Sequence, residues 1–135
     1  MHDLPGSFIV GGQSFTVWSG NPAFPVGSAD GATFWAVNAK RAIDKKMFFL
    51  VVRQDASGAL ALAHQSAPTA AGAGQGTLRA EAGRLVASYF VESGDGKTTR
   101  QVAIDGYVPF RTPGSGGPVA AEPAIDLGAR FNAFD

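Results

Sequence analysis

Several stretches of this chain alternate apolar residues with polar or small ones, the pattern of a strand that buries one face. Residues 77–82 and 98–108 alternate in this way, and residues 84–92 place Leu85, Ala87, Tyr89 and Val91 at every second position. Side chains two residues apart lie on the same face of a strand. The second half of the chain is therefore expected to form antiparallel strands joined by turns.

An unbroken apolar run spans residues 47–53 and reads Met-Phe-Phe-Leu-Val-Val-Arg. Its length is that of a strand, and its lack of alternation predicts burial on both faces. A turn-forming segment follows at residues 54–58, and residues 59–65 then alternate larger side chains with alanine. Residues 47–65 are therefore expected to form a hairpin.

The first third of the chain carries turn signals between short apolar runs. Gly11-Gly12 separates residues 8–10 from residues 13–18, which predicts a hairpin or a bulge. Residues 19–31 contain two prolines and three glycines and are expected to form a loop. Residues 32–37 hold Phe and Trp and are expected to form a short strand.

One short helix is expected near residues 38–46. Asn38 is an acceptable N-cap, and Ala39, Ala42 and Ile43 recur at helical spacing. A helix of this length needs packing against the rest of the protein to be stable. A strand that continues from Trp35 is the alternative interpretation.

These elements together predict an all-β domain, an antiparallel β-sandwich or a small barrel, because many short strands are separated by turn signals. The chain of 135 residues has the size of one domain. We expect that domain, with an N-terminal arm, to span residues 1–110. Residues 111–135 carry three prolines and four glycines with no period, and are expected to form an extended tail.

The tail ends in an aromatic motif that is costly to leave in water. Phe131 and Phe134 follow Arg130, and burial of each Phe would contribute about 1.5–3 kcal/mol. These three residues are predicted to form an interaction site. The tail either folds back over its own sheet or docks on a neighbouring chain.

The charge composition favours contact with other protein. Charged residues make up 16% of the chain, and 11 basic residues balance 11 acidic ones, whereas about 25% is typical of soluble domains. A homo-oligomer or a subunit of a larger assembly is expected, although a compositional bias gives the same numbers. Zero net charge removes the usual case for nucleic acid or an anionic membrane.

Targeting signals are not found in the sequence. No apolar run is long enough for a transmembrane helix, and residues 1–7 do not resemble a signal peptide. The expectation is a protein without classical secretion, placed in the cytoplasm or within a particle assembled there.

Catalytic and metal-binding patterns are weak. The chain has no cysteine, which excludes disulfides, thiolate zinc sites and a cysteine nucleophile. His2 and His64 are too few for a histidine zinc site, so neither a metal nor a cofactor is expected. The glycine-rich residues 72–76 lack the Lys-Ser/Thr that completes a phosphate loop. Asp55 and Asp95 are expected to lie in turns beside glycine, where the aspartate side chain accepts hydrogen bonds from its own backbone.

Two groups of side chains remain as candidates for binding. The basic cluster is expected to be a solvated face, with an acidic partner or nucleic acid as the alternative. Trp18 and Trp35 are possible ligand-binding residues, although aromatic rings in a domain of this size mostly form the core. The members of the basic cluster are Lys40, Arg41, Lys45 and Lys46, with Asp44 among them.

The pattern as a whole favours a non-enzymatic structural or assembly protein that acts through protein–protein contacts. A virion-type cement, neck or tail component is an example of this class. The alternative is a small β-barrel or sandwich that binds a small apolar molecule or a sugar through its tryptophans. A hydrolase on a β scaffold ranks third.

Overall fold

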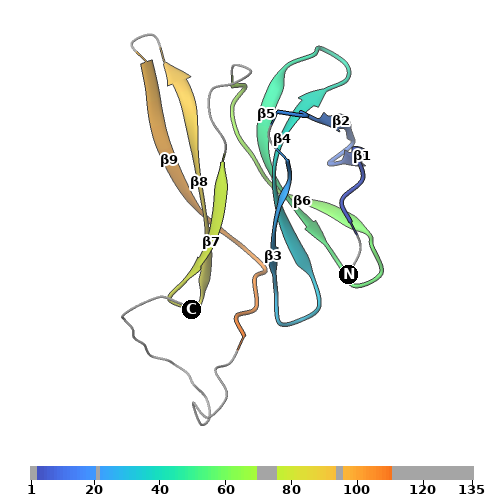
Figure 1. Ribbon diagram of the computed structural model, residues 1–135, viewed down its shortest axis with the longest axis vertical. Coiled ribbons are helices and arrows are strands. Elements are labelled where there is room, and N and C mark those ends of the chain that lie inside the picture. Colours follow the sequence, from blue (N-terminus) through green and yellow to red (C-terminus); the bar gives the residue numbers. More distant parts are fainter. Residues whose placement is uncertain (1–2, 21, 70–75, 94–95, 111–135) are drawn as a thin grey trace.

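The computed structural model describes residues 3–20, 22–69, 76–93 and 96–110 (Figure 1). Every regular element in these ranges is a β-strand, so the predicted all-β antiparallel fold is confirmed. The strands are β1 (Ser7–Val10), β2 (Gln13–Val17), β3 (Phe24–Gly27), β4 (Thr33–Arg41), β5 (Met47–Gln54), β6 (Leu60–Gln65), β7 (Thr77–Glu81), β8 (Arg84–Ser93) and β9 (Gly96–Ile104).

The strands form two antiparallel sheets. The curled sheet has the order β1-β2-β4-β5-β6, and β3 pairs with the first half of β4. It forms a half-barrel, because its first hairpin bends over to reach β6: the side-chain amides of Gln13 and Gln65 exchange hydrogen bonds of 2.8 and 3.2 Å. The three-stranded sheet, β7-β8-β9, packs against the outer face of the curled sheet (Figure 1).

Two hydrophobic clusters lie on opposite faces of β4 and β5. The cluster inside the curl contains Phe8, Val10, Phe15, Trp35, Val37, Ala39, Phe48, Leu50 and Val52. The cluster between the sheets contains Ala32, Phe34, Ala36, Phe49, Val51, Leu78, Leu85, Ala87, Tyr89 and Ile104. Residues 47–52 are therefore buried on both faces, as their unbroken apolar run predicts.

The predicted helix near residues 38–46 is wrong. Strand β4 continues through Arg41, and a tight turn then leads into β5. Val37 and Ala39 point into the curl, and the backbone of β4 pairs with β2 on one side and with β5 on the other. A strand buried on both faces places small apolar residues at spacings that also suit a helix, and its two ladders satisfy the backbone better than a nine-residue helix would.

The predicted loop at residues 19–31 contains a strand, β3. Pro25 lies within it and pairs with Trp35 of β4. Proline has no N–H to donate and is tolerated in edge strands, and β3 is an edge strand. The proline content therefore indicated an edge and not the absence of a strand.

The predicted hairpins are confirmed. β1 and β2 join at Gly11 and Gly12, whose φ angles of 57° and 74° are those that a two-residue hairpin turn favours. In the turn between β5 and β6, a carboxylate oxygen of Asp55 accepts hydrogen bonds from the backbone N–H groups of Ser57 and Ala59. β7, β8 and β9 follow one another as a meander.

The chain after β9 returns to the curled sheet. The backbone of Val108 accepts a hydrogen bond from Ala29 and donates one to the hydroxyl of Ser28, both at 2.8 Å. The predicted tail of residues 111–135, with Arg130, Phe131 and Phe134, lies outside the described residues.

Candidate interaction surface

The outer side of the β1–β2 hairpin and the neighbouring turn between β4 and β5 form a surface with two exposed isoleucines. We call this the hairpin surface; it comprises residues 5–16 and 41–46, together with Leu60. Ile9 is 68% exposed and Ile43 is 88% exposed. In β1, Phe8 and Val10 point into the core, so Ile9 between them must face outward. A single exposed apolar side chain is ordinary, so the meaning of these two depends on the apolar surface around them.

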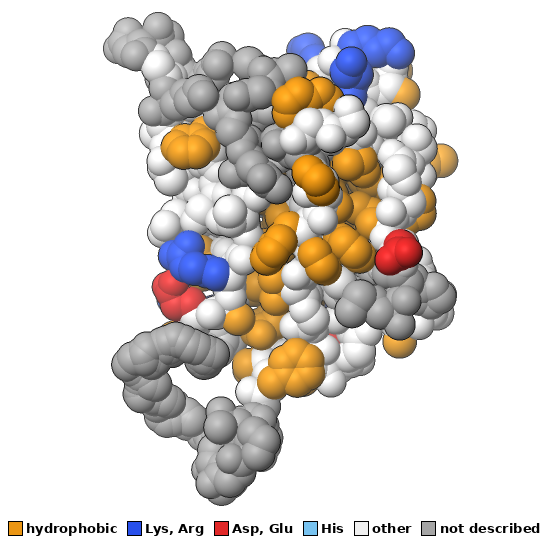
Figure 2. All heavy atoms as spheres, in the orientation of Figure 1, with side chains coloured by type: hydrophobic (Ala, Val, Ile, Leu, Met, Phe, Trp, Pro, Cys, Tyr) orange, Lys and Arg blue, Asp and Glu red, His pale blue; other side chains and the backbone are white. Residues whose placement is uncertain are grey.

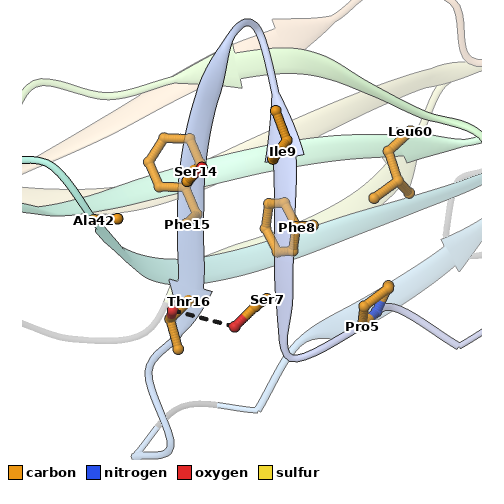
Figure 3. A pocket seen from close by; sticks show the side chains of 9 residues that line it. All are labelled: Pro5, Ser7, Phe8, Ile9, Ser14, Phe15, Thr16, Ala42 and Leu60. Carbon is orange, nitrogen blue, oxygen red and sulfur yellow. Dashed lines mark hydrogen bonds between the residues drawn. The ribbon is translucent and has the colours of Figure 1, made fainter.

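A shallow hollow of about 570 Å³ lies beside Ile9 (Figure 3). Its apolar wall consists of Pro5, Phe8, Ile9, Phe15, Ala42 and Leu60. The hydroxyl groups of Ser7 and Thr16 lie at its rim and are 3.3 Å apart (Figure 3). The hollow is open and mostly apolar, which suits a protein side chain better than an enclosed small ligand.

A second hollow, lined by Arg41 and Ile43, adjoins the first one. The two hollows share Ser14 and Ala42 as lining residues, and the backbone N–H of Ala42 donates to the carbonyl oxygen of Ser14 at 2.9 Å. The hydrogen bond ties the turn to the hairpin. Ile9 and Ile43 therefore belong to one continuous strip of surface.

Arg41 holds the turn that presents Ile43. Its guanidinium donates to both carboxylate oxygens of Asp44 at 3.1 and 2.6 Å, and to the side-chain oxygen of Gln13 at 2.7 Å. It also lies 4.6 Å from the centroid of the Phe48 ring. The hydrogen bond from Arg41 lowers the pKa of Asp44 to about 2. Ile43 is thus exposed by an ordered, cross-linked turn.

The basic cluster surrounds Ile43. Arg41 is paired with Asp44, whereas Lys40, Lys45 and Lys46 are exposed. Lys45 adopts a left-handed φ of 63°, which closes the turn and is uncommon outside glycine. The hairpin surface consequently combines apolar contact area with positive charge, the complement of an acidic and apolar partner.

The two tryptophans lie in different surroundings. Trp35 is 7% exposed inside the curl, and its indole N–H donates to the side-chain oxygen of Gln54 at 3.0 Å. Trp18 is partly exposed after β2, with its ring directly over Gly20. Neither residue lines the hollow in Figure 3. Ligand binding at Trp18 and Trp35 stays a prediction, and the burial of Trp35 leaves its ring little free area.

His64 is part of the joint between the sheets. Its Nε2 lies 2.9 Å from the hydroxyl oxygen of Tyr89, and the Tyr89 ring stacks on Phe49 with centroids 4.7 Å apart. Burial lowers the pKa of His64 and raises the pKa of Tyr89, while Arg100 acts in the opposite direction on the Tyr89 pKa. The described residues contain no group of three or more His, Cys, Asp or Glu side chains that could hold a metal ion.

A second group of exposed apolar side chains lies near the seam between the sheets. Phe24, Val108 and Phe110 are 47%, 41% and 66% exposed, and Figure 2 shows apolar side chains gathered over β3. Phe110 is the last described residue, so this surface borders a part of the chain that the structure does not describe.

Ile9 and Ile43 are the site residues that sequence reasoning missed. Three consecutive apolar residues, 8–10, in a two-faced hairpin were the available signal, because one of the three must point to solvent. Ile43 was assigned to the apolar face of the incorrect helix, which concealed its place at the tip of a turn.

Comparisons of the chain with protein-family models, with curated proteins and with solved structures give no match. Within the described ranges, no helix is long and apolar enough to cross a membrane.

Proposed function

We propose that this chain is a non-enzymatic structural protein that works by packing against copies of itself or against other protein subunits. The observation that carries the proposal is the exposure of Ile9 and Ile43, at 68% and 88%, beside adjoining hollows on ordered backbone. Burial of an exposed isoleucine contributes about 1.5–3 kcal/mol. Two such residues provide a useful share of the energy of a protein–protein contact.

The charge of the hairpin surface supports a partner that is both acidic and apolar. Lys40, Lys45 and Lys46 would attract carboxylates, and Ile9 and Ile43 would bury apolar side chains. The C-terminal sequence has this composition, with Glu122, Asp126 and Asp135 around the predicted anchors Phe131 and Phe134. Arg130 is the one basic residue among them. Docking of this sequence on the hairpin surface of a neighbouring copy is the specific form of the proposal.

Assemblies built in this way include virion-type cement, neck and tail components, and a place in the cytoplasm or within a particle assembled there is part of the proposal. Docking of the C-terminal sequence on the hairpin surface would be a heterologous contact, in which one surface of a copy meets a different surface of the next. Contacts of that kind produce rings or open filaments.

The proposal is tested on the full chain with the substitution Ile43→Ser. The mass in solution, measured by light scattering over a range of concentrations, is expected to fall relative to the parent chain. The double substitution Phe131→Ser and Phe134→Ser is expected to have the same effect. Phe90→Ser is the matched control, because Phe90 is 39% exposed on the three-stranded sheet, away from the hairpin surface.

Circular dichroism and thermal melts of each variant establish that the fold is intact. A parent chain that stays monomeric at high concentration contradicts self-association. An Ile43→Ser variant that assembles to the parent's mass contradicts the role of the hairpin surface.

A further inference from the structure

Strand β9 (Gly96–Ile104) has an open edge. It is the last strand of the three-stranded sheet and pairs with β8 on one side, and no described strand pairs with its other side. Figure 1 shows β9 as the outermost strand of that sheet. The consecutive residues Thr98, Thr99, Arg100 and Gln101 are all exposed. The backbone groups of these four residues on this edge are therefore accessible to another strand.

The other edge strands carry features that discourage pairing. β1 and β3 have four residues each, and β3 contains Pro25. The ladder between β5 and β6 has an irregular register at Val51 and Val52. β7 is five residues long and lies beside β3. Short length, proline, bulges and coverage are the ways in which proteins protect sheet edges from one another.

β9 has none of these protections. It is nine residues long, has no proline, and pairs with β8 in a continuous register from Ile104 to Gly96. Lys97 and Arg100 are the charged residues of this strand, and charges on an edge disfavour those registers that bring like charges together. A long regular edge with these two constraints is suited to a specific strand partner.

We propose that two copies of this chain pair antiparallel through their β9 edges, so that the two three-stranded sheets form one continuous six-stranded sheet. The pairing has two-fold symmetry, so each copy presents the same strand to the other. It goes beyond the proposed function, because it uses a different sheet and a different surface and is tested separately.

Charge selects the register of the pair. With Arg100 on the two-fold axis, two guanidinium groups would be directly opposed, which is unfavourable. With Gln101 on the axis, the Gln101 of one copy faces the Gln101 of the other copy. The side-chain amide can both donate and accept a hydrogen bond, so the two residues can bond to each other. Arg100 then lies opposite Val102, so that no two like charges face each other next to the axis. We therefore assign the axis to Gln101.

The absence of cysteine allows a direct test on the full chain. A single introduced cysteine can form a disulfide only with another copy. In the proposed register the two backbones at position 101 are about 5 Å apart, within the Cα distance that a disulfide spans. Gln101→Cys is expected to become a covalent dimer under dissolved oxygen, as seen on a non-reducing gel.

Two matched variants make the test specific. The Thr99→Cys positions of two copies would be about 13 Å apart, too far for a disulfide. Ser57→Cys, in an exposed turn of the curled sheet, measures the rate of random collisions. Cross-linking of Gln101→Cys at the Ser57→Cys rate overturns the pairing, and faster cross-linking of Thr99→Cys than of Gln101→Cys overturns the register.

A second measurement does not depend on oxidation. Gln101→Lys places two like charges on the axis. In the Ile43→Ser background, where the hairpin contact is removed, it is expected to convert the sedimenting dimer to a folded monomer. A dimer that persists in this variant overturns the proposal. Ile43→Ser is expected to leave the Gln101→Cys cross-link intact, so failure of the hairpin surface and failure of the β9 pair are distinguishable.

Discussion

The two sheets differ in how many of their faces are buried. In the curled sheet, β4 and β5 are covered on both faces, by the interior of the curl and by the three-stranded sheet. In the three-stranded sheet, Leu85, Ala87 and Tyr89 of β8 face the core and are buried, while on the other face Val86 is 9% and Phe90 is 39% exposed. The comparison indicates that β4 and β5 form the centre of the core. The three-stranded sheet leaves a face and an edge accessible.

The two proposed contacts lie on different sheets. The hairpin surface belongs to the curled sheet, and the β9 edge belongs to the three-stranded sheet. A two-fold contact alone closes a dimer, whereas a second, heterologous contact extends dimers into a larger assembly. A chain with both contacts would suit the structural role proposed above.

The largest effect is expected from a substitution that disrupts the contact between the two sheets. Phe49 is 1% exposed and stacks on Tyr89 across the interface. Phe49→Ala is expected to lower the free energy of unfolding by about 3–5 kcal/mol, the usual range for a buried phenylalanine. Denaturant unfolding measures the change. Phe90→Ala is the control on the open face of β8, with an expected loss of about 1 kcal/mol; equal losses would contradict the difference between the sheets.

A smaller loss is expected from adding one carbon at Gly76. A Cβ there would lie 2.0 Å from Cε1 of Phe49, so the ring or the backbone must move. Gly76→Ala is expected to cost about 1–3 kcal/mol, as overpacking of a core does. Gly6→Ala is a control for the loss of glycine itself, since a Cβ at Gly6 meets nothing within 4 Å and the residue has no left-handed φ. A fully stable Gly76→Ala variant would show that the space beside Phe49 can adapt.

Much of this fold could be predicted from the sequence. The alternation in β7 and β8 and the unbroken apolar run in β5 identified those three strands. A strand with one face toward the core shows a period of two, and a strand buried on both faces shows an unbroken apolar run. The helix prediction failed at β4, where burial on both faces conceals the period of two. β3 was missed because only its place at an edge makes Pro25 acceptable.

The candidate surface was harder to predict than the fold. Exposure of Ile9 depends on the pairing of β1 with β2, and exposure of Ile43 depends on where β4 ends. The open edge of β9 depends on the order of strands in the sheet, which is a property of the whole chain. Local patterns contain no information on which strand lies last. Arg130, Phe131 and Phe134 remain predictions from composition.

A change of pH is expected to weaken the joint between the sheets. Burial lowers the pKa of His64 below its ordinary value of 6.5, so the unfolded chain takes up the proton first as the pH falls. Stability from the neutral imidazole is present above pH 6.5 and is lost as the pH falls through the folded pKa. Thermal melts between pH 8 and pH 5 measure this loss. His64→Gln is expected to remove this loss of stability at low pH. A parent chain whose melting temperature does not fall between pH 8 and pH 5 would contradict the burial of His64 against Tyr89.

The smallest expected effect concerns the turn of the curled sheet. Hydrogen bonds from Arg41 lower the pKa of Asp44 from 3.8 to about 2. The stability that its carboxylate contributes is therefore present above pH 3.8 and is lost as the pH falls through about 2. Because the pair is exposed to solvent, salt should screen it and the effect should be slight.

The difference in melting temperature between the parent and Asp44→Asn isolates this contribution from the other carboxylates. The difference is expected to be constant from pH 8 to pH 5 and to shrink toward zero between pH 4 and pH 2, in a range separate from that of His64. At neutral pH, Asp44→Asn should also reduce assembly, because the turn that presents Ile43 loses its ion pair. A melting difference that does not change with pH would show that Arg41 does not hold Asp44 in solution. Other contacts would then have to keep the turn ordered and fix the position of Ile43 on the hairpin surface.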